Sequence, residues 1–181
     1  NYWYVPVQEI PDAKWKDLGK HISNIRTIKS EEKIIGCIPV TNFETNDIIT
    51  IFTKNGMIKR TNLSEFKLQR YSKAVTCINL KDDDMVVDVT ISDLSNVFIS
   101  TSLGYGLWYD IEEVPISGIK ASGVKSINLK DDIVVSGCLF NKNDEYIAVF
   151  TNKGTAKRIK LEEMEKSSRA RRAAQPLRSC C

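Results

Sequence analysis

The residues of this chain best suited to chemistry are cations that recur at matched positions. Lys59 and Arg60 follow one glycine turn, and Lys157 and Arg158 follow another at the same spacing. Lysine and arginine repeated on one surface can neutralise the phosphates of a polyanion. The exposed face of a β-hairpin would carry the same charges without any partner. Composition alone therefore leaves phosphate binding and plain solvation as alternatives.

Other groups able to do chemistry are few. The aspartates of segments 82–84 and 131–132 could hold a metal ion, but they recur at one place in successive repeats, as turn residues do. Three cysteines stand alone in apolar segments, where a thiol is expected to be a small buried hydrophobe. They are Cys37, Cys77 and Cys138. Since the sequence has one histidine, His21, and no Cys-x-x-Cys pair, we predict no metal site, no catalytic residue and no cofactor.

Charge is unevenly distributed along the chain. The 181 residues carry a formal net charge of +3, and segment 151–172 holds eight Lys and Arg against three Glu. A basic zone on a nearly neutral body is typical of a protein with a polyanionic partner. No apolar run approaches the length of a membrane span, and no signal-peptide pattern is present. Unpaired thiols favour a reducing compartment, so we expect a cytoplasmic protein.

The elements that must position these residues repeat about every fifty residues. Gly56, Gly104 and Gly154 stand 48 and 50 residues apart, each between two strand-like runs. A matching turn follows each hairpin, and the segment Val7–Pro11 fits the same turn. Repeats of this length are typical of blades, solenoids or arrays. The phase places Asn1 just after a glycine outside this sequence, so we interpret the chain as part of a longer polypeptide.

The pattern predicts an all-β chain. Expected strands cover residues 34–40, 47–53, 57–61, 85–91, 97–100, 107–109, 133–140, 146–150 and 155–159. About four strands in each period favour four-stranded blades of a propeller-like disc. One short helix is expected at residues 161–172, where glutamates come early and arginines late.

Apolar residues in these strands should fill the blade interiors. The positions expected there are Ile49, Ile51, Val86, Val97, Ile99, Val134, Ile147 and Val149. The tryptophans Trp3, Trp15 and Trp108 are also expected to pack, because a duplex hides the faces of its bases.

Four motifs, taken together and in order, resemble one known family. They are Thr-Lys-Asn-Gly-Met-Ile-Lys-Arg-Thr at 53–61, Gln-Arg-Tyr-Ser-Lys at 69–73, Gly-Val-Lys-Ser-Ile-Asn-Leu at 123–129 and Arg-Ala-Arg-Arg at 169–172. The chain is similar, from residue 1 to about residue 172, to the C-terminal domain of the A subunit of bacterial type IIA topoisomerases. Gyrases in this family carry a Gln-Arg-Arg-Gly-Gly-Lys-Gly box, and segment 69–74 lacks its glycines. The topoisomerase IV branch is therefore favoured.

The resemblance implies a β-pinwheel, a disc of four-stranded blades in which neighbouring blades exchange a strand. We expect three to four blades over residues 1–165. Residues 166–181 are expected to form a basic, truncated or altered tail, because the family's glycine and apolar strand do not follow Arg172.

The resemblance also implies a non-catalytic module that binds and bends double-stranded DNA on a basic rim and helps its enzyme to recognise DNA topology. Implied partners are the breakage-reunion region of the same polypeptide, which holds the catalytic tyrosine, and the ATPase B subunit. The implied location is the bacterial cytoplasm, at the nucleoid. The expected DNA-binding residues are Lys59, Arg60, Lys67, Arg70, Lys73, Lys120, Lys125, Lys157, Arg158, Lys160, Arg169, Arg171 and Arg172.

Two other classes of function remain as alternatives. A protein-interaction propeller without DNA binding would share the repeat, although such propellers usually carry Gly-His and Trp-Asp pairs and neither pair occurs in this sequence. An enzyme would need a nucleophile with its base, a metal cluster or a glycine-rich phosphate loop, and the sequence offers no such motif.

Overall fold

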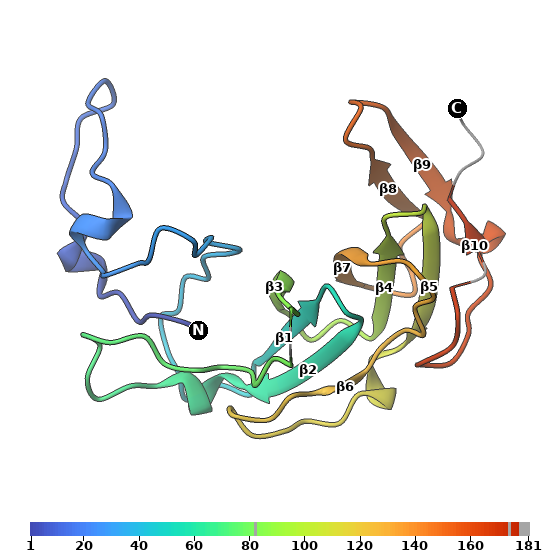
Figure 1. Cartoon of the computed structure of the whole chain (residues 1–181), viewed down its shortest axis with the longest axis horizontal. Coiled ribbons are helices and arrows are strands. Elements are labelled where there is room, and N and C mark those ends of the chain that lie inside the picture. The colour runs from blue at the N-terminus through green and yellow to red at the C-terminus, as the bar shows by residue number, and fades with distance from the viewer. Residues whose placement is uncertain (82, 174, 178–181) are drawn as a thin grey trace.

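The computed structural model describes residues 1–81, 83–173 and 175–177, and its regular elements are strands and short 3-10 turns. The strands are β1 (Ile48–Thr53), β2 (Met57–Asn62), β3 (Val86–Ile91), β4 (Asn96–Thr101), β5 (Tyr105–Asp110), β6 (Val124–Lys125), β7 (Val134–Phe140), β8 (Tyr146–Phe150), β9 (Ala156–Lys160) and β10 (Gln175–Pro176). The 3-10 turns are η1 (Val7–Glu9), η2 (Ile22–Asn24), η3 (Leu63–Phe66), η4 (Ile111–Glu113) and η5 (Leu161–Glu163). Figure 1 shows these elements following one another along an open arc. Among the described residues, no helix is long and apolar enough to cross a bilayer.

Three antiparallel hairpins set the repeat. They are β1–β2, β4–β5 and β8–β9. Their turns contain Gly56, Gly104 and Gly154, with φ of 81°, 77° and 83°. This left-handed conformation favours glycine, which has no Cβ to clash with the backbone. A 3-10 turn follows each hairpin directly, as η3, η4 and η5. The predicted phase of the blades is therefore confirmed.

Each complete blade is closed by a strand from the next repeat. One sheet has the order β3-β1-β2-β6 and the other has the order β10-β5-β4-β7. β6 follows the second hairpin in sequence but pairs with β2 of the first. β10 likewise pairs with β5, in a segment where the sequence predicts no strand. A single antiparallel bridge between Tyr2 and Val75 gives the N-terminal unit the same exchange. The predicted strand-exchanged architecture is confirmed.

One predicted strand does not form. Residues 34–40 are irregular, although β3 and β7 take the equivalent position in the complete blades. There, β3 pairs with β1 and β7 pairs with β4, the first strand of the hairpin in each blade. Among the described residues, no strand takes the place of β1 or β4 beside residues 34–40. This segment therefore lacks a ladder partner.

The predicted helix at residues 161–172 is also wrong. After the single 3-10 turn η5, the backbone is irregular up to residue 173. The amide of Ser167 donates to the carbonyl of Trp108, and the amide of Ala170 donates to that of Ser126, both at 2.8 Å. These contacts, one with β5 of the second blade and one with the segment just after β6, use the donors that a helix would need for its own hydrogen bonds.

The apolar core lies between and within the blades. Phe52, Ile58, Val97 and Tyr109 belong to the largest cluster, which joins the two complete blades. Six of the predicted interior residues are buried and two are partly buried against the core. The six are Ile49, Ile51, Val97, Ile99, Val134 and Ile147, and the two are Val86 and Val149.

Predictions of burial for cysteine and tryptophan hold in part. Cys77 is buried, but Cys37 and Cys138 are exposed. Cys37 lies in the unpaired segment 34–40, and Cys138 lies on β7, the edge strand opposite β10. Trp108 is half-buried and its indole donates to Asn96 Oδ1 at 2.9 Å. Trp15, in contrast, is 98% exposed.

Asp84 and Asp132 are turn residues, as predicted, whereas Asp82 lies outside the described residues. Asp84 Oδ1 accepts hydrogen bonds from the amides of Asn55 (2.8 Å) and Met85 (2.9 Å), and so links its own turn to that of the first hairpin. Asp132 Oδ1 accepts equivalent bonds from the amides of Leu103 and Ile133. Within the part of the chain that the structure describes, no group of three His, Cys, Asp or Glu residues could hold a metal ion.

A buried lysine fastens the exchanged segments together. Lys59 is 0% exposed, and its Nζ donates to the carbonyls of Cys77 (2.6 Å) and Ile119 (2.5 Å). Burial lowers the pKa of this amine below its usual value. The expectation that Lys59 faces outward is therefore wrong. Its stem lies between a blade and the strand that closes it, a long-range contact that the sequence of a hairpin does not reveal.

The turn before β6 yields a prediction for glycine. Gly123 has φ of +82°, and a Cβ there would lie 2.4 Å from the carbonyl oxygen of Ile58. Gly154 has φ of +83°, but a Cβ there would meet nothing within 4 Å. We expect Gly123→Ala to lower the free energy of unfolding by about 2 kcal/mol more than Gly154→Ala, because both strain the backbone but only the first also clashes. Urea denaturation followed by circular dichroism measures the difference, and equal losses would contradict it.

Lys59 yields a second prediction, with a repeat-matched control. In Lys59→Met the carbonyls of Cys77 and Ile119 lose their donor, so the free energy of unfolding should fall by about 2–4 kcal/mol. Lys157→Met changes the equivalent residue of the third hairpin, which is only half-buried, and should cost less than about 0.5 kcal/mol. Denaturation curves for both variants provide the test. A stable Lys59→Met variant would show that the buried amine does not join these segments.

Candidate nucleic-acid interface

Three loops at equivalent places in the repeat carry many of the predicted cations. We call them the crossover loops, and they comprise residues 67–74, 114–123 and 164–173. Each starts after a 3-10 turn (η3, η4 or η5) and leads to the segment that closes the preceding blade. Because the chain must pass from one blade to the edge of another, these loops run outside the sheets. Figure 1 shows them along the lower and right-hand outer side of the arc.

The predicted DNA-binding residues differ in exposure. Lys59 is buried, and Arg60, Lys157 and Arg169 are half-buried. The other nine are exposed, and they are Lys67, Arg70, Lys73, Lys120, Lys125, Arg158, Lys160, Arg171 and Arg172. The structure thus places most of the predicted set at the surface and brings much of it onto the crossover loops.

Two half-buried arginines hold blades together. Arg60 Nη1 donates to the carbonyls of Ile111 (3.1 Å) and Val114 (2.9 Å), so β2 of one blade is tied to η4 of the next. Burial lowers the pKa of this guanidinium, and the carboxylate of Glu112 partly opposes the shift. Arg169 Nε donates to the carbonyl of Glu113 at 2.8 Å in the same way. We assign both side chains a structural role.

A second group of cations has partners at the surface. Lys67 and Lys160 form exposed ion pairs with Glu44 (2.7 Å) and Glu162 (3.1 Å). The hydrogen bond from Lys67 lowers the pKa of Glu44. Lys125 Nζ donates to Asn128 Oδ1, Arg171 Nε donates to Ser168 Oγ, and Arg158 lies 4.8 Å from the ring centre of Tyr146. Such exposed contacts contribute little free energy, so these cations can exchange them for a phosphate.

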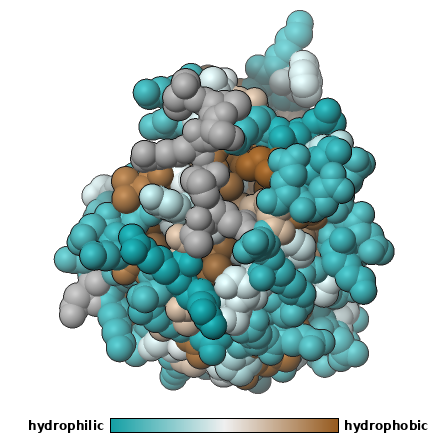
Figure 2. Space-filling view, turned by 90° about the vertical axis from the view of Figure 1, so that its right-hand side faces the viewer, coloured by the Kyte–Doolittle hydropathy of each residue, from teal (hydrophilic) through white to brown (hydrophobic). Residues whose placement is uncertain are grey.

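A third group makes no hydrogen bond or ion pair with the described residues. It comprises Arg70 and Lys73 in the first crossover loop, Lys120 in the second and Arg172 in the third. Each loop therefore presents at least one exposed cation. At the third hairpin, Lys157 and Arg158 lie on β9, where no described strand takes the place of β6 or β10. Figure 2 shows that this end of the molecule is largely hydrophilic.

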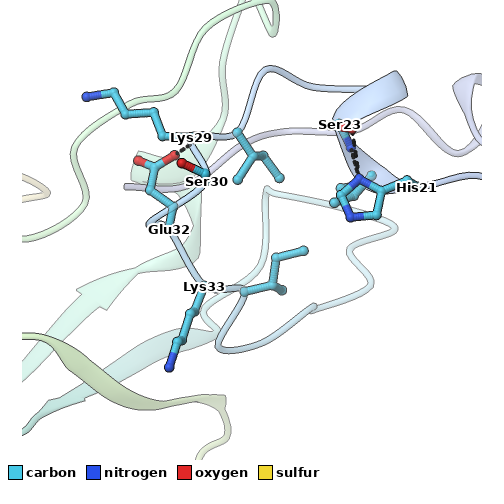
Figure 3. Close-up of a pocket in the computed structure, with 9 residues that line it drawn as sticks. His21, Ser23, Lys29, Ser30, Glu32 and Lys33 are labelled. Carbon is cyan, nitrogen blue, oxygen red and sulfur yellow. Dashed lines mark hydrogen bonds between the residues drawn. The ribbon is translucent and has the colours of Figure 1, made fainter.

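A hollow in the N-terminal unit offers no catalytic arrangement. Figure 3 shows His21 and Ser23 on one side of it and Lys29 and Glu32 on the other. His21 Nδ1 lies 2.8 Å from Ser23 Oγ and accepts from the Ser23 amide, so it caps η2. Glu32 accepts from the amide of Lys29 at 2.9 Å, which is a contact within a turn. His21 is exposed.

The structure contains a fourth loop of this kind, which the sequence-based prediction did not include. Residues 10–21 follow η1 as the crossover loops follow η3, η4 and η5, and they carry Lys14, Lys16 and Lys20, all exposed. The alignment of Val7–Pro11 with the turns of the later repeats is the signal that could have found it. If the turn repeats, then the loop that follows the turn repeats as well.

Comparison with known proteins agrees with this architecture. The family described as DNA gyrase C-terminal domain, beta-propeller, matches residues 4–41, 47–93, 95–136 and 145–172. The A subunit of DNA topoisomerase 4 from Bacillus subtilis (strain 168) is 47% identical over 180 residues, which cover 98% of this chain and 22% of that protein. Its counterpart in Streptococcus pneumoniae is 39% identical, again over 98% of the chain and 22% of its own length. The chain thus spans about a fifth of these curated relatives.

Solved structures give the same result for the fold. A crystal structure of the C-terminal domain of DNA topoisomerase IV matches 97% of this chain and 55% of its own, with a TM-score of 0.91 and 50% identity. A DNA gyrase A C-terminal domain matches 88% of this chain and 52% of its own, with a TM-score of 0.75 but 21% identity, and supports the fold alone. The chain therefore belongs to the DNA gyrase C-terminal domain family, as a C-terminal β-pinwheel domain of the type IIA topoisomerases that is more similar to topoisomerase IV than to gyrase.

Proposed function

We propose that this domain binds double-stranded DNA along the outer edge of the arc and bends it, without catalysing a reaction itself. The observation that carries the proposal is the repetition of exposed cations on the crossover loops. Arg70, Lys73, Lys120 and Arg172 are the central contacts, because their exposed side chains form no hydrogen bond or ion pair with the described residues. The exposed Lys67, Lys125, Arg158, Lys160 and Arg171, and the half-buried Lys157, extend the same surface.

Binding of this kind depends on phosphates and carries little sequence information. Long side chains on loops can follow the DNA backbone but cannot hold the fixed geometry that base recognition needs. A duplex that contacts successive loops of a curved edge must itself curve. Bending 20–30 base pairs by 40–90° costs about 1–6 kcal/mol, and several phosphate contacts can offset that cost.

The role in the whole enzyme follows from the family. Within a topoisomerase IV, this domain would hold a DNA segment for the breakage-reunion region of the same polypeptide, and the ATPase B subunit would complete the assembly. Contact with curved or crossed DNA would bias the enzyme toward certain topologies. This role places the protein at the nucleoid in the bacterial cytoplasm.

The salt dependence of DNA binding tests the proposal. Replacing Arg70, Lys73, Lys120 and Arg172 with alanine removes about four phosphate contacts. The plot of log affinity against log salt concentration should therefore flatten by about three to four units, at about 0.9 for each contact. Fluorescence anisotropy with a 30-base-pair duplex at several salt concentrations gives the slope.

A matched variant carries four alanines at exposed lysines away from the crossover loops and from residues 10–21, namely Lys33, Lys81, Lys130 and Lys142. Its net charge changes by the same amount as that of the crossover-loop variant. If the position of the charges matters, its slope of log affinity against log salt concentration should flatten by less than about half of the change in that variant. Equal slopes in the two variants would show that DNA uses no defined edge. A wild-type chain that binds no duplex at low salt would instead favour the protein-interaction propeller.

A further inference from the structure

Each of the two complete blades holds the crossover loop of the next repeat with a carboxylate. Glu65 is the third residue of η3, and its Oε2 accepts a hydrogen bond from the amide of Ile119 at 2.9 Å. Glu113 is the third residue of η4, and its Oε2 accepts from the amide of Arg169 at 2.7 Å. The same contact therefore recurs from one repeat to the next, with acidic groups on a surface proposed to bind a polyanion.

The contact fixes the second crossover loop at a single residue. The amide of Ile119 donates to Glu65, and the carbonyl of Ile119 accepts from Lys59 Nζ at 2.5 Å. Both partners belong to the first blade, one in η3 and one in β2. The next residue is the exposed Lys120, so this pair of bonds fixes the point from which its side chain leaves the backbone.

The third crossover loop is held in an unfavourable conformation at the same place. Ala170 has φ of 62°, which a residue with a Cβ adopts only where neighbouring contacts hold it. Glu113 binds the amide of the preceding Arg169, and the carbonyl of Ser126 accepts from the amide of Ala170 at 2.8 Å. The exposed Arg171 and Arg172 follow directly. The carboxylate thus helps to maintain the turn that leads to these cations.

An acidic group beside such cations has two opposite effects on DNA binding. Its charge repels phosphate, but its hydrogen bond orders the loop, and a loop that is ordered before binding loses less conformational entropy in the complex. We propose that Glu65 and Glu113 are positioning residues for DNA, because they hold the cations of the second and third crossover loops in the arrangement that meets successive phosphates. The gain from order exceeds the repulsion. This inference rests on the proposed function.

The experiment separates the hydrogen bond from the charge. Glu65→Ala with Glu113→Ala removes both, whereas Glu65→Gln with Glu113→Gln removes the charge and keeps an oxygen that can accept from the loop amide. The double-alanine variant should bind a 30-base-pair duplex about fivefold more weakly than wild type and bend it less, because the loops lose their order. The double-glutamine variant should bind at least as tightly as wild type. Fluorescence anisotropy gives the affinity, and energy transfer between dyes at the two ends of the duplex gives the bending.

A control variant removes two acidic groups that hold no crossover loop. Glu112→Ala with Glu162→Ala changes exposed residues of η4 and η5 whose carboxylates accept no hydrogen bond from the described residues of these loops. It loses the same charge as the double-alanine variant, but it should bind somewhat more tightly than wild type because repulsion falls.

Hydrogen exchange gives a readout that needs no DNA. The amides of Ile119 and Arg169 should exchange faster in the double-alanine variant than in wild type or in the double-glutamine variant, because they lose their acceptor. The amides of β1 should exchange at one rate in all of these chains if the fold is intact. If they exchange faster in the double-alanine variant, Glu113→Ala is compared with Glu112→Ala, its neighbour in the same turn, by the same measurements.

The possible outcomes separate this inference from the proposed function. If the double-alanine variant binds as tightly as wild type or more tightly, while the four-alanine variant of the crossover loops shows its flatter salt slope, the positioning role is wrong and the DNA-binding edge stands. Equal weakening by alanine and glutamine, or unchanged exchange of the two loop amides, would likewise overturn the inference. If the wild-type chain binds no duplex, both proposals fail.

Discussion

The whole architecture depends on one constraint, which is that no blade completes its own sheet. The outer edge of β2 is satisfied by β6, and the outer edge of β5 is satisfied by β10, in each case a segment from one repeat later. Unpaired backbone groups at these edges would be costly to bury and prone to pair with other chains. The exchange therefore fixes the order of the blades and forces the chain to cross between them on the outside. The crossover loops are a direct consequence.

Cations serve this constraint in two distinct ways. The exchanged strands are short, so some backbone carbonyls near them have no hydrogen-bond donor within the sheets. Lys59 binds the carbonyls of Cys77 and Ile119, and Arg60 binds two carbonyls around η4. These side chains lie inside the joints between blades. The cations of the crossover loops, such as Lys120, lie outside the same joints and are open to an external anion.

The sequence predicts local features of this fold much better than its long-range contacts. Glycine spacing and Asn-Gly chemistry locate Gly56 and its hairpin, because a turn is decided by the few residues within it.

Lys59 and Lys157 stand in nearly identical hairpins, yet one is buried and the other half-buried. The difference comes from β6, a strand of the following repeat that covers the first hairpin, with no described equivalent on β9. Segment 34–40 fails to form a strand for a similar reason, since no described strand takes the place of β1 or β4 beside it. Exposure of most cations on the crossover loops can be expected from the sequence because loops lie outside sheets whatever the order of the strands. Their part in DNA binding stays a prediction.

This division of roles bears on how the proposed DNA contact would work. The contacts of the buried Lys59 and the half-buried Arg60 and Arg169 join neighbouring blades, while the exposed cations would supply attraction that salt can screen. Affinity and preferred DNA shape would then depend on different residues. Loss of exposed charge would weaken binding to straight and bent duplexes alike, whereas loosening a joint would reduce the preference between them at nearly constant charge. The described side-chain contacts of Lys59, Arg60 and Arg169 all use backbone carbonyls as acceptors. These joints therefore depend on the path of the exchanged backbone more than on the identity of any one surface residue.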